Sequence, residues 1–89
     1  MREIEVQIVN RLGLHARAAA RLVHAASRYR SSITVNRGAS HVDGKSILGL
    51  LTLAAARGTR LRLVANGADA EAAIEELARL VRERFGEDE

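Results

Sequence analysis

Apolar residues recur at every second position in segments 4–8, 33–35 and 61–65, the pattern of strands with one buried face. Segments 16–27, 47–53 and 70–85 instead carry apolar residues on one helical face. Arg37, Gly38 and Ala39 predict a turn into a short strand at 40–42, so that these two strands form a hairpin. The predicted order is therefore βαββαβα. It favours an α+β open-faced sandwich, with a four-stranded antiparallel sheet covered on one face by three helices.

Two predicted helices have a polar residue at the start. Ser46 stands at the N-cap position of the helix at 47–53, where its hydroxyl can accept a hydrogen bond from a free amide. Segment 66–69 supplies a turn, with Asp69 as the cap of the last helix. The apolar face of that helix extends to Phe85 and is predicted to be core.

The length and composition bound the class of protein. A chain of 89 residues forms one small domain, predicted here as residues 1–89 with an acidic tail at 87–89. It has no cysteine, and no segment has the pattern of a signal peptide or membrane span, so we expect a monomeric cytoplasmic protein without membrane insertion. His15, His24 and His41 are too scattered to predict a metal site, and we expect no cofactor.

The charge is unevenly distributed. Residues 1–86 contain fourteen basic and eight acidic residues, a formal charge of +6, while the last three residues are all acidic. A basic surface suits an acidic protein or a nucleic acid. With one Tyr and one Phe, the chain lacks the aromatic residues on which bases stack, so an acidic protein partner fits better.

Residues 13–17, Gly-Leu-His-Ala-Arg, join the first strand to an alanine-rich helix. The first amides of a helix have no partner within it and favour an anion. His15 adds a nucleophile that is largely neutral near physiological pH, and Arg17 adds a forked donor that matches phosphate oxygens. A lone histidine at a helix start is more often a surface residue or a cap, but an arginine in the first turn opposes the helix dipole unless an anion offsets it.

This motif resembles the active-site signature of the HPr family, the histidine-containing phosphocarriers of the bacterial phosphotransferase system. A second segment, Gly44 to Leu51, resembles that family's signature around a regulatory serine. The resemblance covers residues 1–86 and implies the same sandwich fold. It also implies a carrier rather than an enzyme: Nδ1 of His15 accepts a phosphoryl group from a phosphohistidine of enzyme I and passes it to a IIA-type protein, with Arg17 as the phosphate clamp.

In some members of the family a dedicated kinase phosphorylates the serine that corresponds to Ser46. Regulatory phosphorylation is therefore a second hypothesis for Ser46, in addition to capping. The partner surface is predicted as an apolar patch with a basic rim that includes Arg17; its other members are Ala20, Arg21, Lys45, Ile47, Leu48, Leu51 and Thr52. Burial of Ile47 and Leu51 in the core is the alternative. Leu48 and Leu50 cannot both be buried easily, so we expect at least one to be exposed.

The chain departs from the family pattern at Ala18, where proline is usual. Alanine is the best intrinsic helix former, so the turn should still form. An alanine here resembles the nitrogen-related branch of the family, so a nitrogen-branch or purely regulatory protein that signals by its phosphorylation state is the alternative function. A small basic module that binds nucleic acid is a more remote one.

Overall fold

The computed structural model describes residues 1–89 and confirms the predicted order of elements. The elements are β1 (Arg2–Gln7), α1 (Ala16–Ala26), β2 (Ser32–Arg37), β3 (Ser40–Asp43), α2 (Ile47–Thr52), β4 (Arg60–Asn66) and α3 (Ala70–Arg82), followed by a 3₁₀ turn, η1 (Arg84–Gly86). The boundaries agree with the sequence pattern to within two residues, except at the end of α3.

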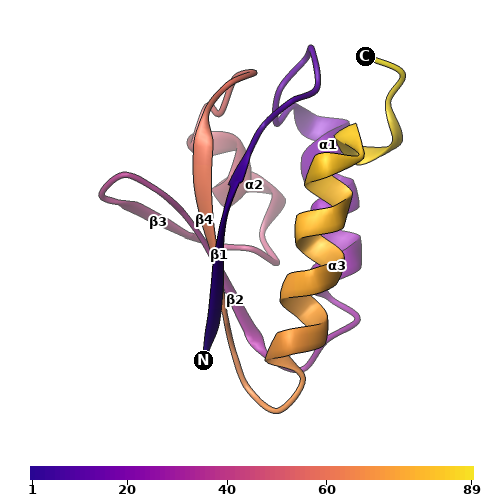
Figure 1. The fold of residues 1–89 in the computed structure, drawn as a ribbon. Coiled ribbons are helices and arrows are strands. Elements are labelled where there is room, and N and C mark those ends of the chain that lie inside the picture. Colours follow the sequence, from indigo (N-terminus) through magenta and orange to yellow (C-terminus); the bar gives the residue numbers. More distant parts are fainter.

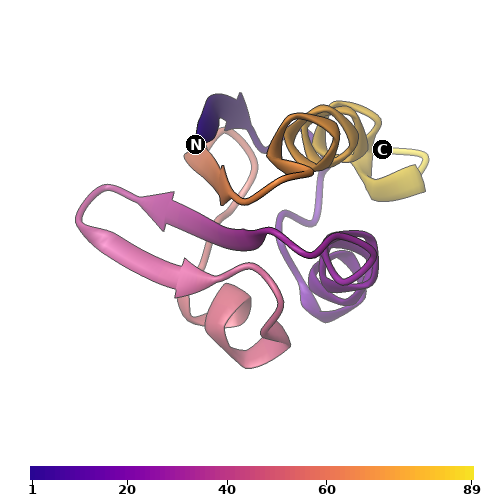
Figure 2. The ribbon, with the colours of Figure 1, turned by 90° about the horizontal axis from the view of Figure 1, so that it is seen from below.

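The four strands form one antiparallel sheet in the order β1-β4-β2-β3. Leu63 in the central strand β4 lies opposite Ile4 of β1 on one side and Val35 of β2 on the other. The helices all pack on one face of this sheet and leave the other face open, as Figures 1 and 2 show. The predicted open-faced sandwich is therefore confirmed.

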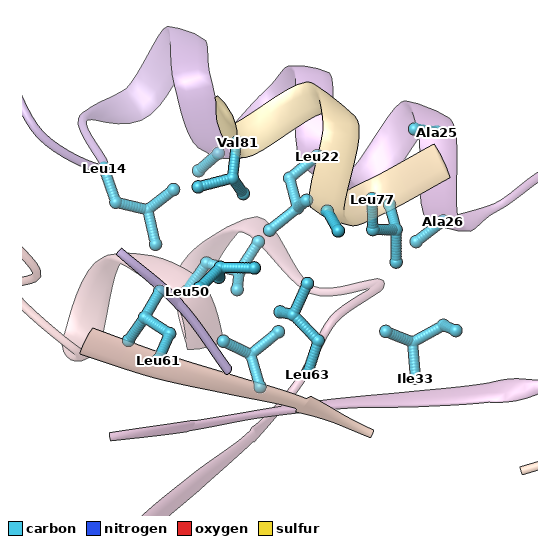
Figure 3. Packing of buried hydrophobic residues seen from close by; sticks show 14 of the residues in the cluster. Leu14, Leu22, Ala25, Ala26, Ile33, Leu50, Leu61, Leu63, Leu77 and Val81 are labelled. Carbon is cyan, nitrogen blue, oxygen red and sulfur yellow. The ribbon is translucent and has the colours of Figure 1, made fainter. Parts of the chain in front are cut away.

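The hydrophobic core lies between the sheet and the helices. It is one cluster of 23 buried residues to which every element except β3 contributes. In Figure 3, Leu22 of α1, Leu50 of α2, Leu63 of β4 and Leu77 of α3 meet in this layer. Because α1 and α3 are both anchored here, their ends are fixed relative to the loops of the sheet. No helix of the protein is long and apolar enough to cross a membrane.

The two predicted helix caps have different outcomes. Ser46 caps α2 as predicted, because its Oγ accepts a hydrogen bond of 3.0 Å from the amide of Gly49. Asp69 occupies the N-cap position of α3 as predicted, but its side chain makes no capping bond there. Its carboxylate instead accepts bonds of 2.9 Å from the amides of Arg30 and Ser31, and thereby ties the loop before β2 to the start of α3.

The last helix is shorter than its apolar pattern predicted. It ends at Arg82, and Arg84 and Phe85 adopt left-handed backbone angles, with φ of 59° and 53°. Phe85 is buried nonetheless, and its carbonyl accepts a hydrogen bond from the guanidinium of Arg21 in α1. Burial of Phe85 in the core thus stabilises a turn where the pattern predicted continued helix. The turn brings the C-terminus beside the loop that joins β1 to α1 (Figure 1).

Candidate functional site

The loop between β1 and α1 is tightly held against the loop before β4. Gly13 has φ of 70°, and a Cβ atom here would lie 2.7 Å from the carbonyl oxygen of Ala55, so the position requires glycine. The next amide, of Leu14, donates to that same carbonyl at 2.9 Å, and the Leu14 side chain is buried. With the residue before it anchored in this way, His15 is presented at the surface from a fixed backbone.

His15 is the N-cap residue of α1, with extended backbone angles and no capping bond from its side chain. Its carbonyl accepts the first helical bond, from Ala19 at 2.8 Å, and the amides of the first turn have no acceptor within the helix. The imidazole side chain is 25% exposed, so a partner protein can reach it. The predicted combination of a histidine and free helical amides is therefore present.

The imidazole has one hydrogen-bonding partner in the protein, and this partner comes from the other end of the chain. Nε2 of His15 contacts Oε2 of Glu87, while Oε1 of the same carboxylate accepts a 2.9 Å bond from Nδ2 of Asn10. Asn10 is fully buried and also donates to the carbonyl of Gly13 at 2.8 Å. No hydrogen bond of the structure involves Nδ1 of His15.

The environment of Glu87 favours its ionised form. Burial acts to raise the pKa of Glu87, but hydrogen bonds from Asn10 and His15, together with the charges of His15 and Arg17, outweigh it. The pKa of Glu87 is consequently held below its ordinary value of 4.5. The carboxylate is therefore an acceptor at neutral pH.

Arg17 is exposed on the first turn of α1 and lies on the same side of the molecule as the C-terminal residues. It lines a shallow hollow of about 160 Å³ together with Arg11, Leu12 and the acidic residues 87–89. The guanidinium makes no hydrogen bond within the protein, so its donors are available to an anion, and its charge acts on Glu87.

The helix α2 packs beside α1 (Figure 2), and the loop that follows α2 lines a pocket together with His15. Leu50 is its one fully buried residue, whereas Ile47 and Leu48 are 40% and 78% exposed. Leu51 is half-buried against the core. The prediction that Leu48 and Leu50 are not both buried is thus confirmed.

The remaining residues of the predicted partner surface also lie at the surface, and several are tied to the backbone. Ala20, Arg21 and Thr52 are exposed and Lys45 is half-buried. Lys45 donates from Nζ to the carbonyl of Tyr29 at 2.8 Å, and Thr52 donates to the carbonyl of Gly49 at 2.6 Å. The Lys45 bond thus holds one residue of the basic rim against the backbone.

Sequence reasoning missed Asn10 and Glu87. In the sequence, residues 87–89 stand out only as a concentration of acidic charge. A helix that continued to Phe85, as predicted, would not have turned Glu87 toward His15. The separation of 72 residues between His15 and Glu87 left no local signal of their contact. The positive net charge around His15 was a weak hint that an acidic segment would be attracted there.

A small open-faced sandwich that presents a histidine at a helix start has the architecture of a phosphocarrier protein. A family model described as "PTS HPr component phosphorylation site" matches residues 2–83. The phosphocarrier protein HPr of Neisseria meningitidis is 45% identical over 84 residues, 94% of each chain, and that of Pseudomonas aeruginosa is 46% identical over 90 residues, the full length of both.

Solved structures give the same result. The crystal structure of HPr-C-His from Thermoanaerobacter tengcongensis superposes with a TM-score of 0.96, at 40% identity and full coverage of both chains. The chain belongs to the HPr family of phosphocarrier proteins of the bacterial phosphotransferase system. Membership implies partners among the enzyme I and IIA proteins of that system.

Proposed function

We propose that His15 is the residue of this carrier that takes up the phosphoryl group, through Nδ1. The observation that carries the proposal is the position of the imidazole, which is a quarter exposed at the N-terminus of α1 with Nδ1 free of hydrogen bonds. The amides of the first turn and the nearby Arg17 are donors for the three phosphoryl oxygens. The other histidines, His24 and His41, are exposed but do not stand at a helix start.

The transfer follows from this arrangement. The lone pair of His15 Nδ1 forms a bond to the phosphorus of a phosphohistidine on enzyme I, while the donor P–N bond breaks and its electron pair returns to the donor ring. Passage to a IIA-type protein is the same displacement with His15 as the leaving group. A site built from helix amides and one arginine stabilises the phosphoryl group without enclosing it, which suits a reversible carrier.

The experiment is intact mass measurement after incubation with phosphoenolpyruvate and a cognate enzyme I, under conditions that preserve acid-labile phosphate. The wild type should gain one phosphate and His15→Ala none. His41→Ala is the matched control, because it removes an exposed imidazole from β3, and it should gain phosphate normally. A phosphate on His15→Ala would refute the assignment.

We infer further that enzyme I and the IIA protein share one docking surface, formed by α1 and α2 around His15. Ile47 and Leu48 supply its exposed apolar part, and Arg17, Arg21 and Lys45 supply a basic rim; Ala20, Leu51 and Thr52 complete it. Such a surface is small and has an apolar centre with a charged rim, as expected for partners that must exchange rapidly. The basic rim favours acidic partner surfaces.

Ser46 is proposed as a regulatory phosphorylation site for an HPr kinase of the phosphotransferase system. Its hydroxyl faces the first turn of α2, beside the exposed Ile47 and Leu48. A phosphate there would place about two negative charges at the apolar part of the docking surface and oppose docking by desolvation and repulsion. Ser46→Asp should therefore accept phosphate at His15 more slowly than both wild type and Ser46→Thr, and equal rates in all three would contradict this role.

The same chemistry at His15 serves a transport branch or a regulatory, nitrogen-related branch. Ala18 follows Arg17 where the family usually has proline, and an alanine here resembles the nitrogen-related branch. The choice between the two branches can be tested directly. The discriminating measurement is the rate of transfer from the phosphorylated protein to IIA proteins of each branch from the source organism. A preference of tenfold or more for one IIA protein would assign the branch.

A further inference from the structure

The structure assigns Glu87 as a positioning residue that fixes the protonation of the His15 ring, so that the proton is held on Nε2 and the lone pair is kept on Nδ1. The inference rests on the proposed uptake of phosphate by His15. It draws on a residue outside both sequence motifs, in the C-terminal segment that follows η1.

The two acceptors around Asn10 determine which atom of its side-chain amide faces Glu87. Its side chain lies between two acceptors, the carbonyl oxygen of Gly13 at 2.8 Å and Oε1 of Glu87 at 2.9 Å. Only the amide nitrogen carries two hydrogens, so Nδ2 must face both acceptors, and Oδ1 is left without a partner. Asn10 is fully buried and cannot exchange these partners for water. The carboxylate of Glu87 is thus held by a fixed donor.

The other oxygen of Glu87 then determines the tautomer of His15. Oε2 contacts Nε2, and an ionised carboxylate can only accept, so Nε2 must carry the hydrogen. In the neutral ring the lone pair consequently lies on Nδ1, the nitrogen that no protein group bonds. Glu87 acts on the reaction through His15. A carboxylate hydrogen-bonded to one nitrogen of a catalytic or metal-bound imidazole generally sets the tautomer and orientation of the ring.

Transfer needs no proton movement in this arrangement. The Nδ1 lone pair forms the N–P bond, the donor N–P bond breaks with its electron pair returning to the donor ring, and the hydrogen on Nε2 stays in place. The phosphorylated ring becomes cationic, and the adjacent carboxylate balances that charge. The other charged groups near this pair are Arg11 and Arg17 on the basic side and Asp88 and Glu89 on the acidic side.

The decisive variant is Glu87→Gln, which keeps the shape of the side chain. Because Asn10 Nδ2 donates, the glutamine must turn its oxygen toward Asn10 and its NH₂ group toward His15. Nε2 then has to accept, so the hydrogen moves to Nδ1 and occupies the attacking nitrogen. Glu87→Ala removes the constraint without reversing it. Glu87→Gln should therefore be the slower of the two, although it is the more conservative change.

The experiment combines two measurements on the full chain. ¹⁵N spectra of the His15 ring at a pH where it is neutral should show hydrogen on Nε2 in the wild type, hydrogen on Nδ1 in Glu87→Gln, and a mixture in Glu87→Ala. The rate of phosphoryl uptake from enzyme I should fall about ten- to hundred-fold in Glu87→Gln, the range found when the hydrogen-bond partner of a metal-bound histidine is replaced. It should fall less in Glu87→Ala.

Glu75→Gln is the matched control, because it makes the same change at an exposed position of α3 away from His15, and it should match the wild type in both measurements. The same tautomer in the wild type, Glu87→Gln and Glu87→Ala would overturn the inference. A Glu87→Gln rate equal to that of the wild type would also overturn it. Faster uptake by both Glu87 variants would also overturn it and show that the tail obstructs the site. If the wild type took up no phosphate at His15, the proposed function would fail, whereas the spectra would still decide the role of Glu87.

Discussion

Leu50 holds α2 in place, and its truncation should loosen the helix that carries Ser46 and much of the proposed docking surface. The helix spans six residues, too few to be stable in isolation, and Leu50 is its one buried side chain. Leu48 lies two residues earlier on the same helix and is 78% exposed. The two leucines therefore form a matched pair in which only burial differs.

The expected loss of stability follows from the difference in burial between Leu50 and Leu48. Leu50→Ala removes a fully buried side chain and leaves a cavity, at a cost of about 3 kcal/mol in the free energy of unfolding. A chain of this length has a total free energy of unfolding of about 4 to 13 kcal/mol. Leu48→Ala should change the free energy of unfolding by less than about 0.5 kcal/mol.

Urea unfolding followed by far-UV circular dichroism tests this prediction. With a slope of about 1 to 1.5 kcal/mol per molar urea, the midpoint of Leu50→Ala should fall by about 2 to 3 M, and that of Leu48→Ala should hardly move. A loss below about 1 kcal/mol for Leu50→Ala, or equal losses for both variants, would refute the reasoning that burial of one leucine anchors α2.

Two further predictions concern docking and pH. Leu48→Glu should slow phosphoryl uptake from enzyme I while the urea midpoint stays near that of the wild type, since it places a charge in the exposed apolar part of the docking surface; an unchanged uptake rate would remove Leu48 from that surface. Hydrogen bonds from the Ser31 hydroxyl and the Arg30 amide lower the pKa of Asp69 from 3.8 to about 2. The stability that Asp69 contributes is therefore fully present above about pH 4 and is lost as the pH falls toward 2. Asp69→Asn should make the urea midpoint less sensitive to acid over this range, and identical pH profiles for variant and wild type would contradict that role.

Most of the secondary structure could be predicted because its signals are local. Alternation at Ile4, Val6 and Ile8, and again at Leu61, Leu63 and Ala65, identified β1 and β4, since a strand with one buried face needs an apolar residue at every second position. Ser46 could be predicted as a cap because the hydroxyl and the Gly49 amide that it accepts from are three residues apart. The fold class then followed from the order of elements.

Asp69 and Phe85 show where local patterns fail. The carboxylate of Asp69 was predicted to cap its own helix, but the loop at residues 30 and 31 offers it three donors, counting the Ser31 hydroxyl, which no nearby sequence could reveal. Phe85 continues the apolar spacing of α3, yet its backbone turns out of the helix. In both cases contacts between distant segments outweighed the local preference.

The sequence by itself determined the chemistry that the chain carries: a histidine and an arginine at a helix start, free helical amides, and a serine at the cap of a second helix. These features depend on residues within one turn of each other, so the motifs contain them completely. The tertiary structure alone decided the surroundings of the imidazole. It folded the end of the chain back through the burial of Phe85 and the bond from Arg21, and set Glu87 and Asn10 beside His15. A contact across 72 residues depends on packing of the whole core, which no local pattern records.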